Sequence, residues 1–194
     1  MRERLLSLNE IEQSVWKELQ RAPLDRHHAW RTPVLATADA EGLPDARTVV
    51  LREVDADDGR LVVYTDTRSA KIAQLEARPH AVLVLWSAGL GWQLRCKVRC
   101  TVHRSGLAVS SRWERVRQSP SAHDYLSPLP PGEALPADGG PIAPDPQAAR
   151  QQPVEHTAFG AIDAQVLAID WLELHREGHR RARFEGAKAV WLQP

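Results

Sequence analysis

The chain has few of the features that mark membrane, secreted or nucleic-acid-binding proteins. Its 25 lysines and arginines are balanced by 25 aspartates and glutamates. A neutral chain lacks the basic surface that binding to a phosphate backbone requires, so we expect no nucleic-acid partner. No run approaches the ~18 apolar residues of a membrane-spanning helix, so we also expect no membrane segment. Because Arg2, Glu3 and Arg4 do not resemble a secretion signal, the sequence predicts a cytoplasmic protein.

Cysteines are few, and the histidines do not have the spacing of a metal centre. Cys96 and Cys100 lie on a segment that alternates between apolar and polar residues, so a strand would place both on its apolar face. We interpret them as buried packing residues. His175 and His179 have the spacing of a helical ligand pair, but arginines flank them, and we favour solvated strand or turn residues. The sequence therefore predicts no metal site.

The pattern of the chain predicts a single, mainly β domain over residues 1–194, with flanking helices. Ser7 and Glu10 form a capping box at the start of a helix that continues to Arg21. Further helices are expected at residues 69–78 and 107–117. Short strands are expected at residues 32–37, 46–54, 61–65, 81–86, 93–103, 159–170, 171–175 and 183–192. Many short strands without regular strand-helix alternation favour an antiparallel barrel.

Residues 119–153 differ in composition from the rest of the chain. They contain most of the prolines, three glycines and few large apolar side chains. Such a segment cannot pack a core of its own, so we expect a long loop rather than a linker between domains. A loop of this length next to a binding site also suits the role of a lid.

Two polar segments predict a cradle for an anion. Residues 47–52 form a β-rich run that begins with Arg47, and a second strand leads into a helix start that carries Ser69 and Lys71. Free backbone N–H groups at a helix start, a hydroxyl, an ammonium group and a guanidinium fork together suit a phosphate. An ordinary helix cap beside two solvated cations explains the same residues about equally well.

The order of these motifs resembles the pyridoxamine 5'-phosphate oxidase-like family of FMN-binding split barrels. The shared motifs are R-x-V-x-L-[RK], then Y-T-x-x-x-S-x-K, then an aromatic-rich strand that leads to Gln93. The resemblance covers residues 31–103 and resumes at residues 159–184. It implies an antiparallel split β-barrel, α+β in class, and a homodimer that binds FMN at its interface.

The resemblance also implies which residues bind FMN. Those that match flavin-binding positions of the family are Arg47, Thr48, Val49, Val50, Tyr64, Thr65, Ser69, Lys71, Gln93, Trp171 and Arg183. Gln93 matches a glutamine that reaches the flavin from the partner side, and Arg183 resembles an arginine near the ring system. Ordinary structural roles in the strands explain some of these residues as well, namely Tyr64, Gln93, Trp171 and Arg183. For Trp86 and Trp92 we favour a core or dimer-interface role over one that covers the flavin.

The chain departs from the oxidase itself at the substrate positions. Ala70 stands where the oxidase has an additional cation, and the Ser-Gln-Ile-Gly core of its substrate segment is absent. We therefore expect a divergent branch of the family that does not form pyridoxal phosphate. The candidates to hold an anionic substrate are Arg52, Arg117 and Ser121. No catalytic residue is assigned from the sequence.

The resemblance implies a flavin-dependent oxidoreductase, in which the cofactor carries the redox chemistry and the protein positions the reactants. Two alternatives remain open at this point. One is a non-catalytic flavin-binding or flavin-sensing protein, and the other is a split barrel that uses a deazaflavin or haem. The sequence names neither a substrate nor an electron acceptor.

Overall fold

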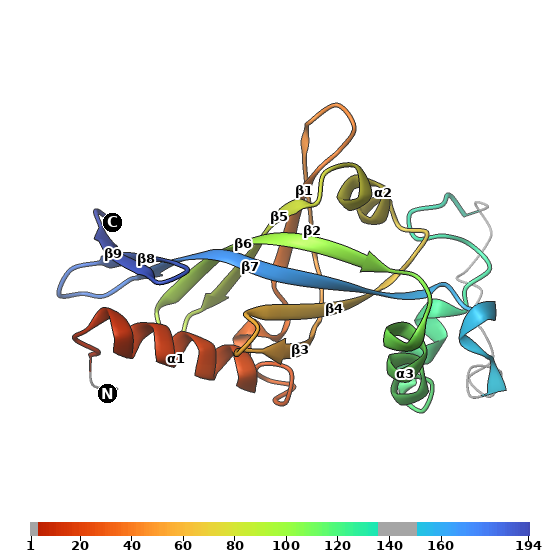
Figure 1. Ribbon diagram of the computed structural model, residues 1–194, viewed down its shortest axis with the longest axis horizontal. Helices are drawn as coiled ribbons and strands as arrows, with labels where there is room; N and C mark the ends of the chain where they lie inside the picture. The colour runs from red at the N-terminus through yellow and green to blue at the C-terminus, as the bar shows by residue number, and fades with distance from the viewer. Residues whose placement is uncertain (1–3, 136–150) are drawn as a thin grey trace.

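The protein is described by a computed structural model that covers residues 4–135 and 151–194 (Figure 1). Its strands form one antiparallel sheet in the order β2-β1-β5-β6-β7-β4-β3, and β8 and β9 continue from β7. The long strands β6 and β7 run side by side along most of the molecule (Figure 1). The strands are β1 (Val34–Ala38), β2 (Pro44–Thr48), β3 (Leu51–Asp55), β4 (Arg60–Asp66), β5 (His80–Ser87), β6 (Trp92–His103), β7 (Phe159–Glu173), β8 (Arg180–Glu185) and β9 (Lys188–Leu192).

The sheet divides between β2 and β3, which are consecutive in the chain but lie at opposite ends of the strand order. The single strand predicted over residues 46–54 is therefore wrong. After Thr48 the chain leaves β1, and the N–H of Val49 donates to the carbonyl of Pro33 at 2.9 Å. From Leu51 onward the chain pairs with β4 instead. This change of partner produces the split barrel, so the predicted fold class is confirmed.

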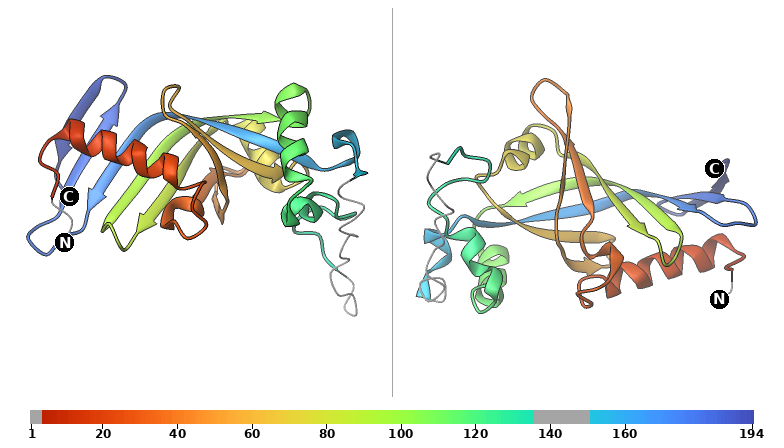
Figure 2. Two further views of the ribbon diagram at one scale, coloured as in Figure 1. Left: turned by 90° about the horizontal axis from the view of Figure 1, so that it is seen from below. Right: turned by 180° about the vertical axis from the view of Figure 1, so that it is seen from behind.

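Three α-helices flank the sheet: α1 (Leu8–Arg21), α2 (Ala70–Ala77) and α3 (Leu107–Val116). The predicted capping box of α1 is confirmed, because Ser7 and Glu10 bond each other's backbone N–H groups. Helix α1 lies across one face of the sheet (Figure 2) and buries Ile11, Val15 and Leu19 there. The length and apolar character that a membrane span requires are not combined in any helix of the described residues.

Two apolar clusters stabilise the described part of the chain. The larger lies between α1 and the sheet, where fully buried side chains such as Leu35, Leu94 and Trp171 pack together. Cys96 and Cys100 are buried in this cluster as predicted, and burial raises the pKa of both thiols to about 12. The smaller cluster joins α3 to the end of β7 and contains Val109, Trp113, Val116, Ala122, Tyr125 and Phe159.

The C-terminal half differs from its prediction in strand boundaries. The strands expected at residues 159–170 and 171–175 are one continuous strand, β7, and the strand expected at residues 183–192 is the hairpin β8–β9. The turn at Gly186 lies in the left-handed region at φ 55°, which glycine adopts without strain. In the proline-rich loop, residues Pro120–Tyr125 form a short 3-10 helix. Residues 136–150 of that predicted loop lie outside the described residues.

Candidate functional site

Arg47 is held in place by neighbours on three elements. Its guanidinium donates to Asp45 Oδ2 at 2.5 Å, to Thr37 Oγ1 at 2.6 Å and to Gln74 Oε1 at 3.0 Å. Gln74 lies on α2 and also donates to Asp45 at 2.8 Å. Because Arg47 pairs with buried Leu35 across β1 and β2, its side chain lies on the inner side of the sheet. The guanidinium of Arg47 is thus held between β2 and α2.

Lys71 lies at the start of α2, on the same side of the barrel. Its Nζ donates to Ser69 Oγ at 2.5 Å and to Thr65 Oγ1 at 3.1 Å. Burial lowers the pKa of Lys71, and the nearby charge of Arg47 lowers it further. The two cations therefore lie close enough to repel each other, and an anion bound between them would relieve that repulsion.

The predicted hydroxyl cap of α2 is not made. Ser69 has the backbone conformation of an N-cap residue, but its side chain donates to the carbonyl of Asp66 at 3.1 Å instead of capping the helix. Both Ser69 and Thr65 are buried, at 6% and 5% exposure. Their hydroxyls, together with Arg47 and Lys71, form what we call the cradle. An anion with several oxygen atoms fits this set of donors.

Arg68 does not replace the cation that is missing at Ala70. Its guanidinium is bound to Asp66, at 3.0 Å from Nε to Oδ1 and 2.6 Å from Nη2 to Oδ2. A further bond joins Arg68 to the carbonyl of Pro128 in the proline-rich loop. The cradle therefore contains two cations, Arg47 and Lys71.

Thr48, Val49 and Val50 lie at the point where the chain crosses from β1 to β4. Thr48 is exposed at the end of β2, Val49 is buried, and Val50 lies outside both ladders. The backbone N–H and C=O groups of Val50 therefore belong to neither strand ladder. A backbone segment that lines a ligand needs polar groups that are left outside the ladders in this way. That these three residues line a flavin stays a prediction.

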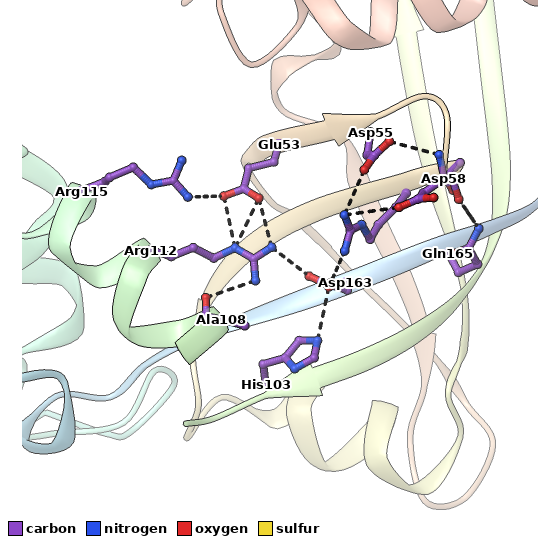
Figure 3. Close-up of polar contacts among 11 residues, drawn as sticks. Glu53, Asp55, Asp58, His103, Ala108, Arg112, Arg115, Asp163 and Gln165 are labelled. Carbon is purple, nitrogen blue, oxygen red and sulfur yellow. Dashed lines mark hydrogen bonds and ion pairs between the residues drawn. The ribbon is translucent and has the colours of Figure 1, made fainter. Parts of the chain in front are cut away.

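Tyr64 bonds to Glu53, a member of a network of charged residues that the sequence did not indicate. Figure 3 shows Glu53 with Arg112 and Arg115. The Tyr64 hydroxyl donates to Glu53 Oε1 at 2.6 Å, and burial together with this bond raises the pKa of Tyr64. Glu53 also accepts from Arg112 Nη2 at 3.0 Å and from Arg115 Nη2 at 3.0 Å. The phenol is thus held on the α3 side of β4, and its ring packs against that of Phe159 at 5.2 Å between centroids. That Tyr64 contacts a flavin stays a prediction.

The network continues from α3 across the sheet (Figure 3). Arg112, with a side chain only 9% exposed, lies 3.4 Å from Asp163 on β7. Asp163 is also 3.3 Å from His103 and 3.5 Å from Arg60. These contacts link α3 to β3, β4, β6 and β7. No local motif could reveal them, because Glu53 and its arginines are 59 and 62 residues apart in the chain.

Gln93 and Arg183 lie on the outer face of the sheet, away from the cradle. Gln93 pairs with Trp86, which is 45% exposed, and Arg183 is also exposed. Trp92 points the other way and is buried in the larger apolar cluster. This agrees with a core role, which is one of the two roles that the sequence favoured for it. Because Arg47 faces the inner side, one copy of the chain does not bring Gln93 or Arg183 to the cradle.

Trp171 is enclosed within its own chain. Its side chain has 0% exposure, its ring centroid lies 5.5 Å from that of Trp92, and Arg180 lies over it at 5.6 Å. On β7, Trp171 lies between Asp170 and Leu172, whose side chains point to the opposite face of the sheet. That opposite face also carries Gln93 and Arg183. One copy of the chain therefore does not bring Trp171 to the cradle, and its contact with a flavin stays a prediction.

The three substrate candidates divide into two sets. Arg52 lies over the Tyr64 ring at 5.8 Å, and its charge acts on the hydroxyl of Tyr125, whose pKa burial raises. Its Nε is buried and has no hydrogen-bond partner among the described residues. Arg117 is instead paired with Glu114 at 2.5 Å, and Ser121 bonds Ser119 at 3.0 Å. The Nε of Arg117 is also buried without a hydrogen-bond partner among the described residues, so the two arginines differ in that Arg117 is held by Glu114.

The fold is shared with two solved structures. A pyridoxamine 5'-phosphate oxidase-related, FMN-binding protein from Nostoc punctiforme superposes with a TM-score of 0.74 at 24% identity, over 99% of this chain and 100% of that one. PhzG from Burkholderia lata, in complex with tetrahydrophenazine-1-carboxylic acid, gives a TM-score of 0.69 at 18% identity, over 99% and 98%. These likenesses show the fold class, which is the split β-barrel.

Sequence comparison places the chain within that class. The family model described as pyridoxamine 5'-phosphate oxidase matches residues 25–140, more than half of the chain, so this protein belongs to that family. The pyridoxine/pyridoxamine 5'-phosphate oxidase of Paracoccus denitrificans is 44% identical over 87 residues, which are 44% of this chain and 40% of that enzyme. That of Caulobacter vibrioides is 38% identical over 106 residues, or 52% and 46%. The chain thus spans about half or less of these relatives' length.

Proposed function

We propose that the protein binds FMN as a homodimer and acts as a flavin-dependent oxidoreductase on a substrate other than that of the oxidase. The observation that carries this proposal is the cradle. Arg47 and Lys71 lie close enough to repel each other beside the hydroxyls of Thr65 and Ser69, at the N-terminus of α2. A phosphate monoester such as that of FMN supplies further negative charge, beyond that of Asp45, and several acceptor oxygens.

The outer-face positions of Gln93 and Arg183 support the dimer. A flavin held by the cradle of one copy can be reached by these residues only from a second copy, because they lie on the opposite face of the sheet. That face also exposes the apolar side chains of Val34 and Trp86, at 38% and 45%. Apolar groups on a sheet face are suited to burial between two copies.

The bound flavin would supply hydride and electron transfer, while the chain supplies position and polarity. Arg47, Lys71, Thr65 and Ser69 would hold the phosphate. Gln93 would offer an amide to the ring, and Arg183 a positive charge near it. The unpartnered Nε of Arg52 would orient an anionic group of the substrate beside Tyr64.

The site differs from an oxidase site at the C-terminal end of α3. Trp113 is fully buried in the smaller core cluster, and its indole N–H donates to the carbonyl of Gln152 at 2.9 Å. Arg117 is already paired with Glu114. A substrate phosphate would therefore meet a buried indole at position 113 and a guanidinium at position 117 that already pairs with Glu114.

We expect the purified protein, loaded with FMN, not to convert pyridoxamine 5'-phosphate into pyridoxal 5'-phosphate under oxygen. The same preparation should be reduced by some other donor, and NADPH and simple amines are the first to mix with it anaerobically while flavin absorbance is followed. Steady formation of pyridoxal 5'-phosphate would contradict the proposed divergence. A flavin that no donor reduces would favour the non-catalytic binding protein.

A further inference from the structure

Strand β3 carries a β-bulge at Arg52. Leu51 pairs with Val63 on β4. Glu53 then pairs with Val62, so the register shifts between the two pairs. In a regular strand, residues two apart point to the same face, and Glu53 would lie with buried Leu51 in the core. The bulge turns Glu53 to the other face, where Arg52 also lies.

Arg52 and Glu53 consequently reach the same side chain, the phenol of Tyr64. The guanidinium carbon of Arg52 lies 5.8 Å from the centroid of the Tyr64 ring. The hydroxyl of the same ring donates to Glu53 Oε1 at 2.6 Å. A guanidinium is attracted to the face of an aromatic ring, so the position of this ring sets that of Arg52.

The phenol is held from two sides. The ring of Phe159 lies 5.2 Å from that of Tyr64, at an angle of 72° between the planes. Glu53 is itself fixed by Arg112 of α3, which donates from Nη2 at 3.0 Å and has a side chain only 9% exposed (Figure 3). The contacts therefore lead from α3 through Glu53 and Tyr64 to Arg52.

Arg52 keeps hydrogen-bonding capacity for a ligand. Its Nε is buried and has no hydrogen-bond partner in the part of the chain that the structure describes. The neighbouring carboxylate of Glu53 is bonded instead by Tyr64 and by two arginines of α3. A buried donor without a partner is costly, so an acceptor oxygen from a ligand at this Nε would stabilise the site.

We infer that Glu53 and Tyr64 are positioning residues, which hold the guanidinium of Arg52 in the orientation that binds an anionic substrate. A cation that is held in place before binding loses less side-chain freedom when the anion arrives. That Arg52 contacts the substrate rests on the proposed function. The positioning itself needs neither flavin nor substrate, because all of its contacts lie within one chain.

Side-chain NMR of the full chain tests the positioning directly. We expect the Arg52 Nε–H to have an order parameter near that of rigid backbone, about 0.85, and to fall below about 0.6 in Tyr64→Phe and in Glu53→Gln. Tyr64→Phe removes only the hydroxyl, so it tests the inference even where the loss of Glu53 weakens the fold. The matched control is Glu76→Gln, which removes the exposed partner of Arg104 Nε at 2.8 Å and should leave Arg52 ordered. An Arg52 that is mobile in the unaltered protein, or ordered in both variants, would overturn the inference.

A second measurement links the positioning to ligand binding. The protein, saturated with FMN so that the cradle is filled, is titrated with inorganic phosphate in a calorimeter. We expect about fivefold weaker phosphate binding in Tyr64→Phe and in Glu53→Gln, and no more than about twofold further loss in the double variant, because both act through Arg52. No phosphate binding by the unaltered protein, unchanged affinity in both variants, or losses that multiply in the double variant would contradict the inference. A failure to bind FMN, with Arg52 released in both variants, would contradict the proposed function alone.

Discussion

Replacing both Arg47 and Lys71 with alanine is expected to remove FMN from the purified protein while the fold stays intact. Each cation supplies charge-assisted hydrogen bonds to a phosphate, worth roughly 1.5–3 kcal/mol apiece. Losing both should weaken FMN binding by a factor of at least ~100. The fold should persist because Asp45, Thr37 and Gln74 keep their bonds to one another, at 2.8 Å and 2.6 Å.

The measurement is a titration of each protein with FMN, followed by quenching of flavin fluorescence, with thermal unfolding recorded in parallel. The matched control is Arg104→Ala/Lys188→Ala, which removes two cations outside the cradle. Arg104 is paired with exposed Glu76, and Lys188 lies exposed on β9. The control should bind FMN as the unaltered protein does. Unchanged FMN affinity in the cradle variant would mean that the phosphate is held elsewhere.

Glu53→Gln is expected to destabilise the protein by about 2 kcal/mol, because it leaves Arg112 without its main partner. The Arg112 side chain is only 9% exposed, and Asp163 at 3.4 Å is its remaining carboxylate. The matched control is Glu76→Gln. Glu76 forms a bidentate pair with Arg104, but both side chains are about half exposed, so its loss should cost no more than about 0.5 kcal/mol.

The effect of Glu53→Gln should also depend on pH. Burial acts to raise the pKa of Glu53, but bonds from Arg112 and Tyr64 lower it below the ordinary 4.5. A carboxylate with a lowered folded-state pKa stabilises the protein fully above its unfolded-state pKa and loses that contribution as the pH falls. In urea unfolding, the difference between the unaltered protein and Glu53→Gln should therefore shrink between about pH 6 and about pH 3.5. A constant difference would show that charge is not its source.

Local patterns predicted those parts of the fold that depend on neighbouring residues. The capping box of Ser7 and Glu10, the apolar stripe of α1 and the alternation around Cys96 and Cys100 are all local, and all three are confirmed. Local patterns could not predict the break in the strand expected at residues 46–54. Their composition is strand-like throughout, but the break at Val49 and Val50 arises because the chain changes its pairing partner from β1 to β4.

The candidate site also has parts that local motifs predict and parts that they do not. Arg47, Thr65, Ser69 and Lys71 were placed near one another by their motifs, and the structure brings them into one cradle. The network around Glu53 could not be predicted, since its partners come from α3 and β7, far along the chain. The burial of Trp171 could not be predicted either, because the register of a strand decides whether a tryptophan on it faces the core or the outside.

The most direct test of the proposed function is a visible absorbance spectrum of the purified protein, with mass spectrometry of the small molecule released on denaturation. The account predicts the two absorbance bands of a flavin and the mass of FMN, at about one FMN per chain. If the protein is colourless and does not take up added FMN, the cradle does not bind the flavin phosphate. A released deazaflavin or haem would equally contradict the proposed cofactor.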